Sequence, residues 1–489
     1  MVIANTAYAR TISEAFHEQD IAELRAIGKS AEDAAEELHV LRGGPRPLDL
    51  ARPCTAGDGV LRLDDEEARD AARVYWDDAW RRQISKFIVA AGSASRMFQM
   101  FETGDEDQTR LFCERLPELA LFPMLDAAMR KRGADAVELA CKGDWRPLAD
   151  VVMSSDGLGM AELPKGLMPF HAYPDGVRTP LEEHVAEAVR YAAGYGNRVH
   201  VHAVVASEHA DQVCRHLEGA GRKCQTANLR VKTDVSVQSS SSRTVALDAQ
   251  GELLRDEDGA LVLRPAGHGA TLENLNALHG DIVFVRTVDN VLPDEMHTYV
   301  SSQKRVLAGV LLQIEAKIHA CLTALSRGET SDDILREGVE LLTGRLGVAL
   351  PATWDGMARS ERRGFLFERL NRPLRVCAVI PNGGHPGGAP VWIKTPEGER
   401  LRIVDKPEVD LDDKRSRSVW ESAAYFNTAD IVCSLRDFRG RPFDLMRFQA
   451  ADEWYVLEKH WRGEPVRVLE RSGLWNSAMA EWNTVFLEA

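Results

Sequence analysis

The chain has 489 residues, of which 60 are Lys or Arg and 75 are Asp or Glu, and its formal net charge is −15. With 44% hydrophobic and 28% charged residues it has the composition of a globular protein, which excludes a wholly disordered, collagen-like or disulfide-scaffold chain. The acidic balance argues against a general nucleic-acid coat, which needs an excess of Lys and Arg, but it leaves room for a local basic pocket that binds a small phosphorylated ligand.

The cysteines and the apolar runs indicate the compartment. The eight Cys are scattered and form no CxxC pair, so we expect free, mostly buried thiols in a reducing compartment. The N-terminus lacks a cationic start followed by an apolar core, and no apolar run approaches the roughly 20 residues that span a bilayer. The sequence therefore predicts a soluble, cytoplasmic protein with no membrane partner.

The first part of the chain reads as helical. Residues 1–80 are rich in Ala, Glu, Asp and Arg at helical spacing, and we interpret them as a helical N-terminal extension that covers a face of the next domain. The helical spacing ends before residues 86–91, which form a short apolar run of the kind that makes a buried parallel strand. A main domain is expected over 81–440, followed by a C-terminal segment, 441–489, that docks on it.

Further apolar runs alternate with helical patterns in the main domain. The strand candidates are 199–205, 235–238, 281–285 and 374–380. Two helical insertions are expected, at about 102–150 and about 301–372. Strands that alternate with helices predict an α/β fold with a mostly parallel, mixed sheet.

The first candidate site element is the loop after the first strand, Gly92-Ser93-Ala94-Ser95-Arg96-Met97. Small side chains let the backbone approach phosphate groups, whose charge is met by amide N–H groups and by the basic residue four positions after the glycine. The loop is neither a Walker A motif nor a Rossmann fingerprint, because Gly-Lys-Ser/Thr and the GxGxxG spacing are both missing. Taken alone, the loop is a weak signal, because a strand followed by Gly and Ser is often only a tight turn.

Two further elements carry groups suited to phosphate and metal. Lys165 lies in a proline-bounded loop that would present a positioned counter-charge for phosphate, the alternative being a solvated loop lysine. Gly267-His268-Gly269 offers a backbone against which a planar ring or a sugar can press. Asp289 follows an apolar strand at its carboxyl end, where open α/β sheets place ligand groups, and a carboxylate there can hold Mg²⁺.

Together these elements resemble a known family. GSASRM resembles the G-x-G-T-R-M loop of sugar-phosphate nucleotidyltransferases, PKGLMPF resembles their P-K-x-L-x-P motif, and RPAGHG with VRTVDN resembles the P-P-G-H-G and V-S-N-x-D-N pair of UDP-sugar pyrophosphorylases. Gly387-Gly388 through Asp405 resembles that family's G-G … L-L-E segment, and residues 426–431 resemble F-N-T-N-N-L. The order of motifs agrees from about 84 to 435. The chain is therefore similar to UDP-sugar pyrophosphorylases, and in particular to an uncharacterised bacterial branch of that superfamily.

The resemblance implies a GT-A-like, Rossmann-related fold and a uridylyltransferase that makes an NDP-sugar from UTP and a sugar 1-phosphate with Mg²⁺ or Mn²⁺. It assigns catalytic roles to Arg96, Lys165 and Asp289, and makes Asp289 the metal ligand as well. The nucleotide-binding residues that it implies are Ala90, Ala91, Gly92, Ser93, Ser95, Gln238, Gly267, His268 and Gly269. The acceptor-binding residues that it implies are Thr287, Gly388, Asp405 and Asn427.

Departures from the family pattern leave the acceptor open. Thr287 replaces an Asn, Asp405 replaces a Glu, and Asp430 replaces the second Asn of F-N-T-N-N, all where the family contacts the sugar. The alternatives are therefore transfer to a non-sugar phosphate or phosphonate, and a non-catalytic nucleotide-binding protein that keeps the fold. The sequence predicts neither the oligomeric state nor the base.

Two histidines lie outside these motifs. His200 and His202 would occupy one face of the strand expected at 199–205. Because no third ligand of suitable spacing is evident in the sequence, we interpret them as packing or surface residues rather than as a metal pair.

Overall fold

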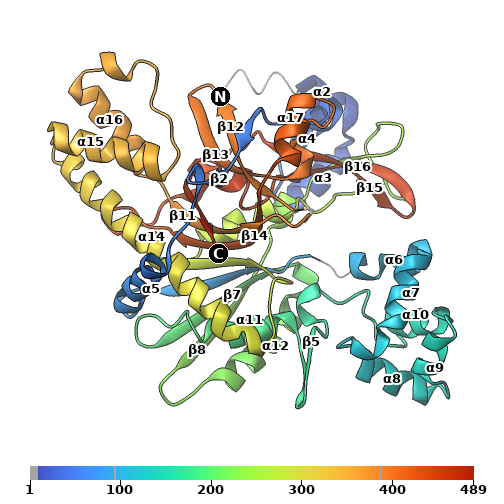
Figure 1. Ribbon diagram of the computed structural model, residues 1–489. Helices are drawn as coiled ribbons and strands as arrows, with labels where there is room; N and C mark the ends of the chain where they lie inside the picture. The colour runs from blue at the N-terminus through green and yellow to red at the C-terminus, as the bar shows by residue number, and fades with distance from the viewer. Residues whose placement is uncertain (1–8, 93–94, 385–386) are drawn as a thin grey trace. The chain divides into compact units, whose positions relative to one another are not determined.

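A computed structural model describes residues 9–92, 95–384 and 387–489 of the chain (Figure 1). The chain divides into two compact units, each assembled from segments that are far apart in sequence. Unit 1 comprises Met1–Asp77, Gln238–Val283 and Arg305–Ala489, and unit 2 comprises Asp78–Val237 and Phe284–Lys304. The sequence pattern, in contrast, suggested consecutive parts. Both units are mixed α/β structures; the pairs of the large sheet are mostly parallel, whereas the two smaller sheets of unit 1 are antiparallel.

Unit 2 is built on four neighbouring strands. Their order is β10 (Ile282–Thr287), β4 (Ile84–Val89), β7 (Arg198–Val205) and β8 (Arg230–Val237). The strand β7 is parallel to both β4 and β8. Every residue of β4 is buried, as expected for an apolar run in a parallel sheet that is covered on both faces. Three of these strands match predicted runs, and β8 begins earlier than its predicted counterpart.

Two helices of unit 2 pack on this sheet. They are α11 (Pro180–Ala188), on β7, and α12 (Ala210–Cys224), on β8. The first turn of α11 is fixed by its sequence, because Thr179 Oγ1 accepts a hydrogen bond from Glu182 N and the Glu182 carboxylate accepts one from Thr179 N. Proline follows Thr179 directly, at the first helical position, where no N–H is needed.

A group of short helices in unit 2 has a core of its own (cyan in Figure 1). They are α6 (Gln99–Thr103), α7 (Glu106–Glu114), α8 (Phe122–Lys131), α9 (Ala136–Cys141) and α10 (Arg146–Met153). Leu116, Leu125 and Leu148 are completely buried in this core. The group agrees with the helical pattern expected at about 102–150. A hairpin of β5 (His171–Tyr173) and β6 (Gly176–Arg178) follows it.

Unit 1 contains a run of five strands. Their order is β2 (Thr55–Ala56), β3 (Gly59–Leu61), β17 (Asn483–Glu488), β11 (Leu374–Pro381) and β14 (Tyr425–Ser434). The strand β17 pairs in parallel with β3 and β11, whereas β14 is antiparallel to β11. The end of the chain is thus an interior strand rather than only a docked segment, and the N-terminal region, expected to be helical, also contributes strands.

Two smaller sheets complete unit 1. One has the order β1 (Leu50–Pro53), β12 (Ala389–Thr395) and β13 (Gly398–Val404), and the other β15 (Trp454–Trp461), β16 (Glu464–Arg471) and β9 (Ala246–Leu247). The N-terminal helices share a core with β9 and β16; these helices are α2 (Ala9–Ala15), α3 (Glu18–Ala26) and α4 (Ala31–Gly43). Two short helices, α13 (Leu272–Asn276) and α17 (Lys414–Glu421), complete the unit.

The helical block expected at about 301–372 consists mainly of α14 (His297–Ser326), α15 (Asp332–Glu340) and α16 (Arg359–Leu370). A further helix of unit 1, α5 (Asp65–Ala79), lies so close to α14 that a Cβ on Gly309 would stand 1.8 Å from Ala71 O. In the part of the chain that the structure describes, one helix, Asp294–Ser326, is by length and composition apolar enough to cross a membrane, but 61% of its apolar window is buried inside the fold. A core helix of a soluble protein has these same properties.

Candidate functional site

The carboxyl end of β4 leads into the loop that the sequence analysis identified. Pairing with β7 continues through Ala90, and the chain is exposed at Gly92. Here Lys165 N donates a hydrogen bond to Gly92 O over 3.4 Å, and Val288 N donates one to Val89 O over 3.1 Å. Three segments that are far apart in sequence therefore meet at the carboxyl ends of β4 and β10, which is where open α/β sheets bind ligands.

Part of this loop can be described only in outline. Ala91 is partly buried. Ser93 lies outside the described residues. Ser95 and Arg96 belong to a 3₁₀ turn, Ser95–Phe98, and for these two residues the structure describes the backbone alone.

The central pair of the site is Lys165 and Asp289. Lys165 Nζ donates a hydrogen bond to Asp289 Oδ2 over 2.8 Å, and the two side chains are 26% and 43% exposed. Burial by itself would raise the pKa of Asp289, but the hydrogen bond and the charge of Lys165 hold that pKa below its usual range, with help from a hydrogen bond to the Thr287 side chain. Asp289 is therefore an accessible carboxylate that stays ionised at neutral pH.

The backbone of the loop that carries Lys165 is closely packed. A Cβ on Gly166 would stand 2.9 Å from Leu181 Cδ1 and 3.2 Å from Val288 Cγ2, so this position has room for hydrogen only. The 3₁₀ turn Lys165–Leu167 starts directly after Pro164, whose φ is fixed by its ring. The loop therefore presents Lys165 from a packed backbone, as the proline-bounded sequence predicted.

A buried ionic cluster lies in the strands and helix behind this edge. Lys86 on β4 and Glu187 on α11 are both completely buried, with Lys86 Nζ 3.3 Å from Glu187 Oε1. Burial lowers the pKa of Lys86 to about 7, although Glu187 opposes this shift. Burial would raise the pKa of Glu187, but the charges of Lys86, Arg286 and Lys304 hold it far below its usual range. One buried carboxylate thus serves three basic side chains, all of unit 2.

His184 connects this cluster to the site. Its Nε2 lies 3.1 Å from both Thr287 O and Val288 O, the two residues that precede Asp289. Its backbone O accepts a hydrogen bond from Lys86 Nζ over 3.1 Å. Burial, followed by the charge of Lys86, lowers the pKa of His184 well below its usual value, so the ring is neutral and donates Nε2–H to these carbonyls. His184 therefore braces the end of β10, a role that the sequence analysis missed.

Unit 1 holds the second group of predicted residues, centred on His268. This residue opens a 3₁₀ turn, His268–Thr271, and its ring stacks on Trp475 with the ring centroids 4.3 Å apart. His268 Nδ1 accepts a hydrogen bond from Leu474 N over 2.9 Å. Burial lowers the pKa of His268, while Asp405 and Glu470 oppose that shift. The ring is therefore neutral and carries its proton on Nε2.

The glycines beside His268 make room for the C-terminal segment. A Cβ on Gly269 would stand 2.3 Å from Ser472 O, and one on Gly267, whose φ is +74°, would stand 3.2 Å from the Glu470 carboxylate. The sequence analysis expected a planar ring or a sugar to press against these glycines. In the structure, residues 470–472 pack against them. No local pattern places that segment beside Gly267.

The remaining predicted residues of unit 1 surround Asp405. Its Oδ2 accepts a hydrogen bond from the Tyr455 hydroxyl over 2.9 Å, and burial raises its pKa. A Cβ on Gly388 would stand 2.5 Å from Asp405 Oδ1. Asn427 N donates to Gly388 O over 2.8 Å, and Asn427 Oδ1 is buried without a hydrogen-bond partner among the described residues.

Gln238 belongs to the same group. Its Nε2 donates to Ser242 Oγ over 3.2 Å and lies 3.5 Å from Gly267 O. The predicted residues therefore form two local groups. Unit 2 holds the phosphate-loop residues with Lys165, Thr287 and Asp289, and unit 1 holds Gln238, Gly267–Gly269, Gly388, Asp405 and Asn427.

The family model described as "Domain of unknown function (DUF4301)" matches residues 17–489. The chain belongs to this family. None of the curated proteins compared with the chain matches it significantly.

Several solved structures are similar to this DUF4301 protein. The uridine diphosphate N-acetylglucosamine pyrophosphorylase of Trypanosoma brucei, in complex with an inhibitor, is 12% identical over 99% of this chain and 77% of its own, with a TM-score of 0.48. A UDP-glucose phosphorylase of T. brucei is 10% identical over 96% and 73%, with a TM-score of 0.44. A mutant UDP-glucose pyrophosphorylase of Leishmania major in complex with UDP-glucose is 10% identical over 96% and 74%, with a TM-score of 0.40.

Proposed function

We propose that this chain is a nucleotidyltransferase that transfers UMP from UTP to a sugar 1-phosphate and releases pyrophosphate. The observation that carries the proposal is the pairing of Lys165 with Asp289 at the carboxyl ends of β4 and β10, beside Gly92. An ammonium, an ionised carboxylate and an exposed loop backbone at one sheet edge are the groups that a nucleoside triphosphate and its metal require. The order of sequence motifs supports the same assignment, and with it a GT-A-like arrangement.

The residues present fit a divalent cation at Asp289. Mg²⁺ in phosphoryl-transfer sites is held by one or two carboxylates and by substrate phosphates, and Asp289 is an accessible carboxylate beside the phosphate loop. When bound, Mg²⁺ or Mn²⁺ would neutralise part of the charge on the triphosphate. We therefore assign Asp289 as the metal ligand of the proposed enzyme.

The chain's own groups supply positioning and counter-charge in this mechanism. An oxygen of the acceptor phosphate forms a bond to the α-phosphorus of UTP, the bond from that phosphorus to the β-bridging oxygen breaks, and pyrophosphate leaves with the electron pair. A phosphate anion is already nucleophilic, so no Ser or Cys is needed. The backbone at Ala91 and Gly92 would bind the triphosphate, and Lys165 and Arg96 would neutralise its charge.

The sequence resemblance assigns substrate-binding roles to residues of unit 1 as well. We assign the uracil to Gln238 and Gly267, the nucleotide phosphates to His268, whose neutral ring keeps a proton on Nε2 to donate, and the acceptor to Gly388, Asp405 and Asn427. The buried Oδ1 of Asn427, which has no hydrogen-bond partner among the described residues, is suited to accept a hydrogen bond from a substrate hydroxyl.

A second acceptor class has an observation in its favour. Asp405 already accepts a hydrogen bond from Tyr455, and burial raises its pKa, so a sugar hydroxyl would have to compete for this carboxyl group. Transfer to a non-sugar phosphate or phosphonate is therefore the alternative. The cytoplasmic location predicted from the sequence suits either acceptor, because UTP and small phosphates are cytosolic metabolites.

Pyrophosphate release by the purified chain tests the proposal. The protein is incubated with Mg²⁺ and each of four NTPs, against a panel of sugar 1-phosphates, other small phosphates and phosphonates. We expect release only with one NTP and one acceptor, and a fall of about 100-fold or more in Asp289→Asn and in Lys165→Ala.

Matched variants make the test specific. Lys142, directly after α9, forms an exposed ion pair with Glu138 of α9 over 2.6 Å, and neither residue belongs to the proposed site, so Lys142→Ala and Glu138→Gln should keep full activity. Nucleotide binding without pyrophosphate release from any pair of substrates would instead indicate a non-catalytic nucleotide-binding protein. Unchanged rates in Asp289→Asn would remove this carboxylate from the mechanism.

A further inference from the structure

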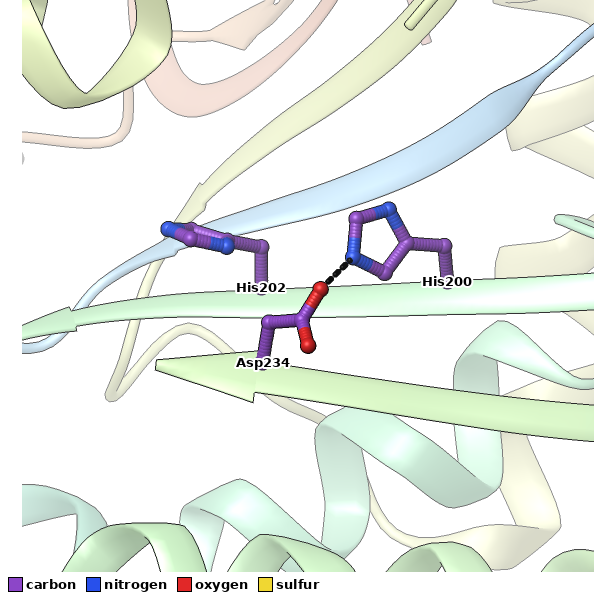
Figure 2. Close-up of side chains that lie close together, drawn as sticks. All are labelled: His200, His202 and Asp234. Atoms are coloured by element: carbon purple, nitrogen blue, oxygen red, sulfur yellow. Dashed lines mark hydrogen bonds and ion pairs between the residues drawn. The ribbon is translucent and has the colours of Figure 1, made fainter. Parts of the chain in front are cut away.

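His200, His202 and Asp234 lie together on one face of the unit 2 sheet (Figure 2). The two histidines are on β7, and the parallel register places Asp234 of β8 directly opposite His202. On the other face of β8, a Cβ on Gly221 of α12 would stand 3.2 Å from Thr233 Cγ2. Because side chains alternate along a strand, Asp234 points away from α12, to the face that the histidines share.

The three side chains bring ligand atoms close together. One atom from each residue can be chosen such that all three lie within 4.8 Å of one another, and His200 Nε2 is 2.8 Å from Asp234 Oδ2. His202 is 9% exposed, and its Nδ1 is buried with no hydrogen-bond partner among the described residues. A buried ring nitrogen without a partner costs free energy, and an incoming cation would give this nitrogen one.

The other nitrogen of each ring is held by a serine. Ser85 Oγ lies 2.9 Å from His200 Nδ1, and Ser236 Oγ lies 2.8 Å from His202 Nε2. Histidines that bind metals usually donate their second N–H to such an acceptor, which fixes the ring's orientation and tautomer. The strand registers supply both serines, because Ser85 of β4 lies opposite His200, and Ser236 of β8 lies opposite Val204, two residues beyond His202.

The protonation states also suit a metal. Burial lowers the pKa of His200, against the charge and hydrogen bond of Asp234, and it lowers the pKa of His202 to about 4. Burial would raise the pKa of Asp234, but hydrogen bonds from Lys232 and His200 lower it overall. At neutral pH the trio therefore has two neutral imidazoles and one carboxylate, the forms that act as ligands.

A second cluster in unit 2 is a weaker candidate. Glu183, Asp294 and His297 also lie within ligand distance of one another, but Arg178 Nη1 stands 2.8 Å from Asp294 and 3.6 Å from Glu183. The Tyr173 hydroxyl also donates to Glu183, over 2.6 Å. A guanidinium cannot give up its charge, so Arg178 competes with any metal ion for both carboxylates.

We propose that His200, His202 and Asp234 bind one borderline-soft divalent transition-metal ion, such as Zn²⁺, with a fourth position open to water. Two nitrogens and one oxygen suit Zn²⁺ better than Mg²⁺, which takes oxygen ligands. Lys232, whose side chain is 68% exposed and whose Nζ lies 2.6 Å from Asp234 Oδ2, occupies the carboxylate when the metal is absent. The ion would link β7 to β8, and this site is separate from Asp289 and from the proposed reaction.

Metal titration of the full-length, tag-free protein tests the site. Equilibrium dialysis against Zn²⁺ alone should give one bound ion per chain, and Co²⁺ in its place should give the visible absorption of a four-coordinate ion. The double variant His200→Ala/His202→Ala should lose this ion, and His202→Gln should weaken binding by about 100-fold or more. Lys232→Gln should tighten binding by roughly fivefold, because it removes a competing exposed cation.

Three variants serve as controls. His460→Ala removes an exposed histidine of β15, Asp294→Asn changes the second cluster, and Asp289→Asn changes the proposed catalytic site, and all three should bind Zn²⁺ as the wild type does. Failure of the wild type to bind, or binding that survives in the folded double variant, would overturn the proposal. Because the readout is metal binding alone, its outcome is independent of whether pyrophosphate is ever released.

Discussion

In the buried ionic cluster of unit 2, we expect removal of the Glu187 charge to lower the free energy of unfolding much more than removal of the Lys86 charge. Glu187 is a completely buried carboxylate whose pKa is lowered by the charges of Lys86, Arg286 and Lys304. Glu187→Gln would remove the negative charge that faces these three buried or nearly buried basic groups. Breaking a buried ion pair from one side typically costs about 3–5 kcal/mol of unfolding free energy.

Lys86→Met is the matched change on the other side of the pair. It leaves Glu187 with Arg286 and Lys304, fills the volume with an unbranched apolar chain, and loses one hydrogen bond to His184 O. Because Arg286 and Lys304 still compensate the Glu187 carboxylate, this variant leaves no buried charge uncompensated, and we expect a loss of no more than about 1 kcal/mol.

Thermal unfolding followed by circular dichroism distinguishes the two variants. For a domain of about 150–250 residues, 1 kcal/mol corresponds to about 2–4 °C, so Glu187→Gln should lower Tm by roughly 6–20 °C and Lys86→Met by less than about 4 °C. Equal losses in the two variants, or a Tm for Glu187→Gln within about 2 °C of the wild type, would refute the assignment of Glu187 as the shared counter-charge.

The same cluster predicts a pH dependence. The folded-state pKa of Lys86 is about 7, because burial disfavours its ammonium, whereas the unfolded chain keeps this proton up to about pH 10. Between these values the unfolded state binds more protons, so the wild-type free energy of unfolding should rise with pH, by at most about 1.4 kcal/mol per pH unit. Lys86→Met lacks this titrating group, so its free energy of unfolding, relative to that of the wild type, should fall between pH 7 and pH 9. A difference that stays constant over this range would contradict the shifted pKa.

Two further predictions concern unit 1 and a helix of unit 2. Gly269→Ala should lower Tm, because its Cβ would stand 2.3 Å from Ser472 O. Gly219→Ala inside α12 meets nothing within 4 Å and should raise the free energy of unfolding by about 0.5–1 kcal/mol. A melting assay in which Gly269→Ala has the higher Tm of the two would argue against this packing. Trp475→Ala should uncover the ring of His268, whose pKa burial lowers, so an NMR titration should give a higher pKa for His268 than in the wild type.

Much of the fold could be predicted where a strand is mostly apolar. The runs that became β4, β7, β10 and β11 are buried almost throughout, and that burial is visible in the sequence. The first half of β8 alternates charged with apolar or small residues and was missed, since only one of its faces is covered. The strands β3 and β17 are short and pair across nearly the whole chain, a pairing that no local pattern specifies.

The candidate site was predictable to a similar degree. Lys165 and Asp289 were each identified by a local signal, a proline-bounded loop and the end of an apolar strand, and the fold brings them to hydrogen-bond distance. Asp234 was missed as a partner of His200 and His202, because only the parallel register of β7 and β8 makes it their neighbour. The sequence around Asp234 alternates charged and apolar or small residues, and this pattern does not indicate which residues of a neighbouring strand lie beside the carboxylate.

The hydrogen bond between Lys165 N and Gly92 O has an evolutionary consequence. The chain leaves the sheet edge after Gly92, builds the helical group with its own core, and returns to the same point at Lys165. Since closing a longer loop costs only a slowly growing entropy, residues can be gained or lost inside this excursion without moving either of its anchors. The helical group is thus a place where relatives can differ greatly in length, and acquire new surfaces, while the Lys165–Asp289 pair keeps its geometry.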